Sequence, residues 1–165
     1  MKVAILFNAV YPYRTGVFDC LGDDYTVIYS CHTEPNRTWV ATELKHRHVF
    51  LKERLIRYGW EGFYHINPEV VLVLGRLNPD VVVLYGFGLT QQLGFLWAKF
   101  NGRGVVVWTD GWTHTERHKS WRQNLIARFI VRHSHAFIAS SYKAQSYLVE
   151  LGARPERVFV SRIVR

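Results

Sequence analysis

Short apolar runs alternate with amphipathic segments along most of the chain. Apolar runs of strand length lie at 2–7, 25–30, 80–84, 104–108, 135–139 and 157–160. Such continuous runs are typical of parallel strands that are buried on both faces. Between them, apolar residues recur at helical spacing in 67–78, 89–100, 121–130 and 141–151. The alternation predicts an α/β fold, a single Rossmann-like doubly wound parallel sheet with helices on both faces and right-handed crossovers.

Residues that favour helix ends support this division. Asn67 and Pro68 form a helix start, and Gly152 is placed to end the last helix. Between the first two strands, 16–21 has room for a short helix only. The segment 46–64 fits neither the helical nor the strand period, so both a strand and a basic helix remain open there.

Composition narrows the class of protein. With 165 residues, of which 48% are hydrophobic and 21% charged, the chain forms one globular domain. Its two cysteines, Cys20 and Cys31, are typical of free thiols in a reducing cytosol. The eight histidines are scattered, so no metal site is expected. Dinucleotide and P-loop glycine motifs are absent from the sequence, which leaves NAD and ATP without their main support.

A net charge of +8 predicts an acidic partner, which could be nucleic acid, an anionic membrane surface or a phosphorylated small molecule. One segment, 45–60, mixes basic and aromatic side chains, a combination that suits a membrane interface. A solvated basic face explains that segment about as well. The residues concerned are Lys45, Arg47, Lys52, Arg54, Arg57, Tyr58 and Trp60.

Ligands of open parallel sheets bind at the carboxyl ends of the strands. After the first strand, we expect Arg14, Thr15 and Gly16 to form a loop immediately before the first helix. Gly16 would let backbone amides approach a ligand at the positive end of that helix, and Arg14 could pair with a phosphate or carboxylate. A plain turn is the alternative.

A second loop, 108–115, follows the strand at 104–108 and is rich in polar and aromatic groups. Asp110 and His114 are its candidate functional residues, and Trp112 could stack on the apolar face of a sugar. Packing is the simpler interpretation of Trp108. A third loop carries Tyr85, Gly86 and Phe87 followed by Gly88; its glycines would permit close approach of a ligand, although turn geometry explains them equally well.

The order of these features resembles the N-terminal half of two-domain, GT-B fold glycosyltransferases, the retaining enzymes of the family 4 type. The matching pieces are Pro12-Tyr13-Arg14 with Phe18, Arg37-Thr-Trp39, 77–83, Val106-Val-Trp108 with Asp110, 128–141 and Leu151-Gly-Ala153. They cover nearly the whole chain. The first loop departs from the family pattern, because Gly16 stands where a glycine pair is common.

The resemblance implies roles for these residues. Arg14, Thr15 and Gly16 would approach the diphosphate of a nucleotide-sugar donor, which is a substrate, so that neither a cofactor nor a metal is expected. Asp110 and His114 compete for the catalytic position that faces the donor sugar and the acceptor hydroxyl. The acceptor would be bound by Tyr13, Tyr85, Gly86, Phe87 and Trp112.

The resemblance therefore implies an acceptor-binding domain of a cytoplasmic enzyme that builds surface polysaccharide or glycolipid, peripheral to the inner face of the membrane. Nucleic acid is not expected as its partner. The donor-binding domain would lie outside this chain, and we expect the 165-residue chain to be inactive alone. The alternatives are a non-catalytic α/β module that binds nucleic acid or a phosphorylated ligand, and a flavodoxin-like or nucleotide-sugar-modifying domain.

Overall fold

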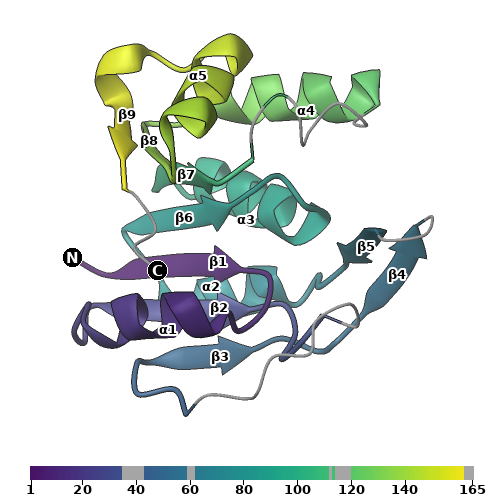
Figure 1. Cartoon of the computed structure of the whole chain (residues 1–165). Coiled ribbons are helices and arrows are strands. Elements are labelled where there is room, and N and C mark those ends of the chain that lie inside the picture. Colours follow the sequence, from purple (N-terminus) through teal and green to yellow (C-terminus); the bar gives the residue numbers. More distant parts are fainter. Residues whose placement is uncertain (35–42, 59–61, 112, 114–119, 162–165) are drawn as a thin grey trace.

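The computed structural model describes residues 1–34, 43–58, 62–111, 113 and 120–161. Seven parallel strands form the central sheet in the order β3-β2-β1-β6-β7-β8-β9, and an antiparallel pair, β4-β5, lies beside it (Figure 1). In chain order the elements are β1 (Val3–Phe7), α1 (Pro12–Asp19), β2 (Tyr25–Tyr29), β3 (His48–Phe50), β4 (Leu55–Tyr58), β5 (Gly62–His65), α2 (Val70–Leu77), β6 (Val81–Tyr85), α3 (Leu89–Phe100), β7 (Gly104–Thr109), α4 (Trp121–Arg132), β8 (Ala136–Ala139), α5 (Tyr142–Leu151), the 3-10 turn Pro155–Arg157 and β9 (Val158–Val160). The predicted doubly wound α/β fold is confirmed.

The direction in which successive strands are added to the sheet reverses between β1 and β6. β1 and β6 pair side by side, with Val3 opposite Val81 and Leu6 opposite Leu84. From β1 the chain continues to β2 on one flank, whereas from β6 it continues to β7 on the other. The loops that follow β1 and β6 therefore diverge at the carboxyl edge and leave a crevice, which is where open α/β sheets bind their ligands.

Each face of the sheet has its own hydrophobic core. Helices α2, α3, α4 and α5 cover one face, and their buried side chains pack on Leu6, Leu84 and Val107. On the other face α1 contributes Phe18, which packs with Phe7 among the aromatic side chains of the sheet. Figure 1 shows α1 in front of the strands and α2 and α3 behind them. Both cores reach the carboxyl edge and hold its loops in place.

The first helix begins earlier than the sequence predicts. α1 begins at Pro12 rather than after Gly16, because proline at the first helical position has the right φ and needs no hydrogen-bond partner for its nitrogen. Arg14, Thr15 and Gly16 therefore lie inside the helix, and the predicted loop of these three residues is wrong.

The ambiguous segment 46–64 forms strands over its described residues. β3 extends the main sheet beyond β2, and β4 pairs with β5 in an antiparallel hairpin. The alternative of a basic helix is wrong for this region; Trp60 lies outside the described residues. No helix in the described part of the chain has the length and apolar character of a membrane span.

Candidate functional site

Aromatic rings gather beneath the carboxyl edge at the ends of β1, β6 and β7. Tyr85 stacks on Phe7 with ring centroids 4.0 Å apart, and Trp108 meets Tyr85 edge-on at 5.9 Å. Tyr11, which caps α1, contacts both Phe7 and Tyr85. Tyr13 stacks on Tyr11 at 5.7 Å, and its side chain is 41% exposed. The rings thus lead from the core to an exposed tyrosine at the rim.

Asp110 is held on this rim by a residue of the core. The Tyr85 hydroxyl donates a hydrogen bond of 2.6 Å to Oδ2 of Asp110, which is itself exposed. Burial, reinforced by the negative charge of Asp110, raises the pKa of Tyr85 far above its usual range, so the phenol remains a donor. The turn that follows β7 is fixed by the Gly111 amide, which donates to Thr109 Oγ1 at 3.0 Å. A carboxylate in a set orientation can accept a hydrogen bond from a sugar hydroxyl or receive its proton.

Arg14 is buried next to this carboxylate-bearing rim. Its guanidinium lies 4.6 Å from the centre of the Trp108 ring, and Nη2 donates to Ser140 Oγ at 3.0 Å. Only 3% of the residue is exposed, Nε has no hydrogen-bond partner, and no carboxylate of the described residues forms an ion pair with it. A buried cation without a counter-ion is costly. Arg14 is therefore suited to meeting an anion that enters from outside the described chain.

The two neighbours of Arg14 do not form the expected amide cradle. The Thr15 hydroxyl donates to the carbonyl of Pro12 at 2.9 Å, within its own helix. Gly16 lies in the second turn of α1, exposed, with no atom within 4 Å of the position that a Cβ would occupy. The prediction that Gly16 brings the amides of the helix N-terminus to a ligand is wrong, because that N-terminus lies at Pro12.

The third predicted loop divides between two places. Gly86 has a φ of +83°, and its amide donates to the Trp108 carbonyl at 2.9 Å, so turn geometry accounts for this glycine. Phe87 lines a groove of about 390 Å³ together with Leu89 and Ile126. Tyr85 joins the Asp110 rim through its hydrogen bond, and the role of Phe87 in acceptor binding stays a prediction. The predicted residues Trp112 and His114 lie outside the described residues.

The backbone of Gly88 lies close to the side chain of Gln91. A Cβ at this position would lie 2.6 Å from Oε1 of Gln91, whose amide nitrogen donates to Oδ1 of Asn8 at 2.9 Å. This hydrogen bond connects the loop after β1 with the first turn of α3 across the crevice. Because Gly88 has no side chain, Gln91 can lie against it and hold the loop after β1 in place.

Sequence reasoning missed a second polar group at the same edge. His65 Nε2 lies 3.4 Å from Oε1 of Glu34, and the Tyr11 hydroxyl donates to that oxygen at 3.5 Å. The side chain of His65 is only 8% exposed and that of Glu34 only 14%, and His65 Nδ1 is buried without a hydrogen-bond partner. A carboxylate beside an imidazole is a common pair for moving protons. The two residues are far apart in the sequence, and His65 follows the segment whose structure the pattern left open, so no local signal marked them.

The described residues hold no cluster of three or more His, Cys, Asp or Glu side chains that could bind a metal ion. The rim instead combines tyrosine rings, one exposed carboxylate and one buried arginine, a set that fits a polyhydroxylated ligand together with an anionic group.

The family model of the glycosyl transferase 4-like domain matches residues 12–162 of the chain. The chain belongs to this family. The resemblance stated from the sequence is thereby confirmed at the level of the family. No curated protein matches this glycosyl transferase 4-like domain in sequence.

Solved structures show the same fold. The domain is similar to Anabaena HepE in complex with UDP-glucose, with a TM-score of 0.71 and 15% identity over 100% of this chain and 44% of that one. It is also similar to S. aureus MnaA with UDP, with a TM-score of 0.61 and 16% identity over 97% of this chain and 43% of that one. The UDP-GlcNAc 2-epimerase of Methanocaldococcus jannaschii has a TM-score of 0.57 and 18% identity over 97% of this chain and 45% of that one. The domain therefore spans less than half the length of these proteins. At such low identity the likeness establishes the fold alone.

Proposed function

We propose that this domain is the acceptor-binding half of a retaining glycosyltransferase. The enzyme would transfer a sugar from a nucleotide-sugar donor to a glycan or glycolipid on the cytoplasmic side of the membrane, in the synthesis of surface polysaccharide. The observation that carries the proposal is the exposed Asp110 carboxylate, which Tyr85 holds at 2.6 Å on an aromatic rim. Family membership and the UDP-glucose complex of HepE support it.

Each group on the rim has a role in this proposal. Tyr13 stacks against the acceptor sugar, and Asp110 accepts a hydrogen bond from its attacking hydroxyl. Arg14 faces the diphosphate of the donor, which would supply a counter-ion to this buried guanidinium, because no carboxylate of the described residues pairs with it. His114 remains the alternative to Asp110. The nucleotide sugar is a substrate here, and we propose a reaction without a metal.

The remaining donor contacts would come from a second domain. HepE, of which this chain covers 44%, was solved with UDP-glucose. We propose that a domain outside the 165 residues holds the nucleotide and that these residues alone do not turn over UDP-glucose. Release of UDP from UDP-glucose by the purified 165-residue protein would contradict this part of the proposal.

Nuclear magnetic resonance can test acceptor binding on the 165-residue protein. We would titrate it with the methyl glycosides of glucose, galactose, mannose and N-acetylglucosamine. At least one of them should shift the backbone resonances of Tyr13, Tyr85 and Asp110. Asp110→Asn should weaken that response, whereas Glu156→Gln, in the exposed turn before β9, should not.

Two results would refute the proposal in different ways. Tight binding of UDP-glucose with no response to any glycoside would assign the rim to a donor or to a sugar-modifying reaction such as epimerisation. Strong, salt-dependent binding of RNA without a response to sugars would favour the alternative of a basic binding module.

A further inference from the structure

The outer surface of α4 carries large apolar side chains that the fold leaves in solvent. Trp121, Leu125 and Phe129 follow one another at intervals of four residues, and they are 67%, 56% and 54% exposed. This spacing places them along one side of the helix. The opposite side, with Ala127 and Ile130, is buried in the core. α4 is therefore apolar on both sides, and the core accounts for only one of them.

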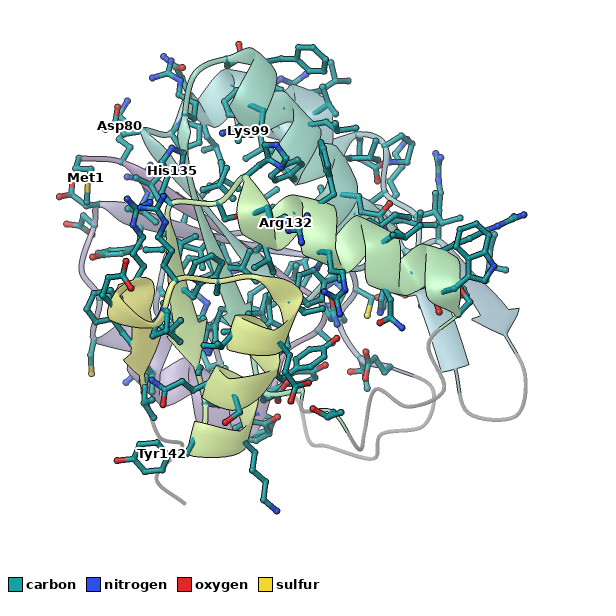
Figure 2. The ribbon with its side chains drawn as sticks, turned by 90° about the horizontal axis from the view of Figure 1, so that it is seen from above. Met1, Asp80, Lys99, Arg132, His135 and Tyr142 are labelled. Carbon is teal, nitrogen blue, oxygen red and sulfur yellow. The ribbon has the colours of Figure 1, made fainter. Side chains whose placement is uncertain are left out.

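The neighbouring helix continues this surface. The rings of Phe95 in α3 and Phe129 in α4 pack edge-on with their centroids 6.0 Å apart, and Lys99 Nζ donates to the carbonyl of His133 at 3.0 Å. The two helices therefore lie side by side (Figure 2). Phe100 on α3 is 87% exposed. We call this surface the α3–α4 face; its exposed apolar residues are Leu89, Leu96, Phe100, Trp121, Leu125, Ile126 and Phe129.

The charged residues within the helices α2, α3 and α4 have a single sign. The helices α2, α3 and α4 contain no Asp or Glu, although the whole chain has 13 acidic residues. Their charged residues are all basic: Arg76, Lys99, Arg122, Arg128 and Arg132. The guanidinium of Arg122 lies 5.4 Å from the Trp121 ring, so a cation and an aromatic ring occupy the same end of α4. Such a surface complements a negatively charged partner with an apolar interior.

We infer that the α3–α4 face docks on an anionic lipid bilayer. Exposed aromatic and aliphatic side chains would enter the boundary between head groups and acyl chains, and the flanking arginines would meet the lipid phosphates. A second copy of the chain fits less well, because two faces of like charge would repel each other. The segment 45–56 also fits less well, since Ile56 is the one large side chain that is both apolar and exposed among those described there. The inference rests on side-chain exposure and charge and is independent of the proposed function.

Flotation with lipid vesicles tests the apolar part of this face. The protein should bind vesicles of equal parts phosphatidylglycerol and phosphatidylcholine and should not bind phosphatidylcholine alone. The triple variant Trp121→Ser, Leu125→Ser, Phe129→Ser should lose binding. Its matched control, Val17→Ser with Phe159→Ser, changes side chains that are 51% and 63% exposed elsewhere and should bind like the wild type. Circular dichroism confirms that both variants are folded.

The basic part of the face needs its own comparison. Arg122→Gln with Arg128→Gln should weaken binding about thirtyfold, because each basic residue near an anionic surface contributes about 1 kcal/mol. Lys52→Gln with Arg54→Gln, two exposed positions in the segment 45–60, should have a smaller effect.

Three results would overturn the inference. The first is a folded triple variant that binds as well as the wild type. The second is a larger loss of binding from the Lys52 and Arg54 variant than from the Arg122 and Arg128 variant. The third is sedimentation of the wild type as a dimer that the triple variant abolishes, without vesicle binding, which would assign the face to a second copy.

Discussion

The hydroxyl of Tyr85 donates a hydrogen bond of 2.6 Å to the carboxylate of Asp110 and so connects the ends of β6 and β7. Tyr85 pairs with Trp108 in the sheet register, two residues before Asp110. Its ring is buried and stacks on Phe7. The orientation of an exposed carboxylate therefore depends on the packing of the core beneath it.

Tyr85→Phe tests this dependence, since phenylalanine keeps the ring and removes the hydroxyl. We expect the free energy of unfolding to fall by about 1 kcal/mol, because the exposed carboxylate can bind water instead. Affinity for the methyl glycoside that binds the rim should fall about tenfold, a loss of about 1.4 kcal/mol. Urea unfolding and the resonance titration measure the two effects. Unchanged glycoside affinity would show that the Tyr85 hydroxyl does not position Asp110.

The sequence was sufficient for the sheet because its strands are buried on both faces. Runs such as β6 and β7 have few polar residues, and the helices that cover them carry a clear apolar stripe. The strands β3, β4 and β5 are only three or four residues long, and two of them lie outside the main sheet. Their pattern is too short to show a period, which is why 46–64 could not be assigned.

A site residue could be placed from the sequence where it directly follows a strand. Asp110 follows β7 directly, so its place on the rim could be expected from the topology. The burial of Arg14 could not, because it depends on where α1 begins and on Ser140, which lies 126 residues away. The contact between Glu34 and His65 likewise joins the loop after β2 to the end of β5, which only the folded chain brings together. Pairs of this kind have no local signature.

Gly94→Ala should destabilise the fold where α3 crosses β1. A Cβ on Gly94 would overlap Cδ1 of Leu6, which is 1% exposed and has little room to move. We expect a loss of about 1–3 kcal/mol, the usual cost of overpacking a core. Gly75→Ala in α2 is the matched control, because its Cβ would meet no atom within 4 Å. The control should gain about 1 kcal/mol from helix propensity. Urea unfolding measures the free energy of unfolding of both variants. Equal changes in the two variants would contradict the close packing of α3 on β1.

Stability in acid should depend on Asp19. A hydrogen bond of 2.6 Å from the His46 ring, with further bonds from the amides of His46 and Lys45, holds the pKa of Asp19 below its ordinary value of 3.8. The ionised carboxylate therefore stabilises the fold above pH 3.8, and this stability is lost as the pH falls through the pKa of the folded state.

Asp19→Asn removes this titration and keeps an oxygen that can accept from the two amides. As the pH falls below about 4, the free energy of unfolding of the wild type should fall more steeply than that of the variant. Asp23→Asn, at an exposed carboxylate, should follow the wild type. Urea unfolding at a series of pH values measures the slopes. Parallel curves for wild type and Asp19→Asn would show that the contact between Asp19 and His46 does not contribute.

The two cysteines should differ strongly in reactivity. Cys31 is fully buried, and burial, aided by the charges of Glu34 and Glu53, raises the pKa of its thiol to about 12, whereas Cys20 is exposed. Near pH 8 only about one Cys31 in ten thousand would be a thiolate, the form that reacts. A disulfide reagent such as dithionitrobenzoate should therefore label one thiol rapidly in the native protein and the second only after unfolding. Cys20→Ser should remove the rapid phase and Cys31→Ser should leave it, and two rapid equivalents in the wild type would contradict the burial of Cys31.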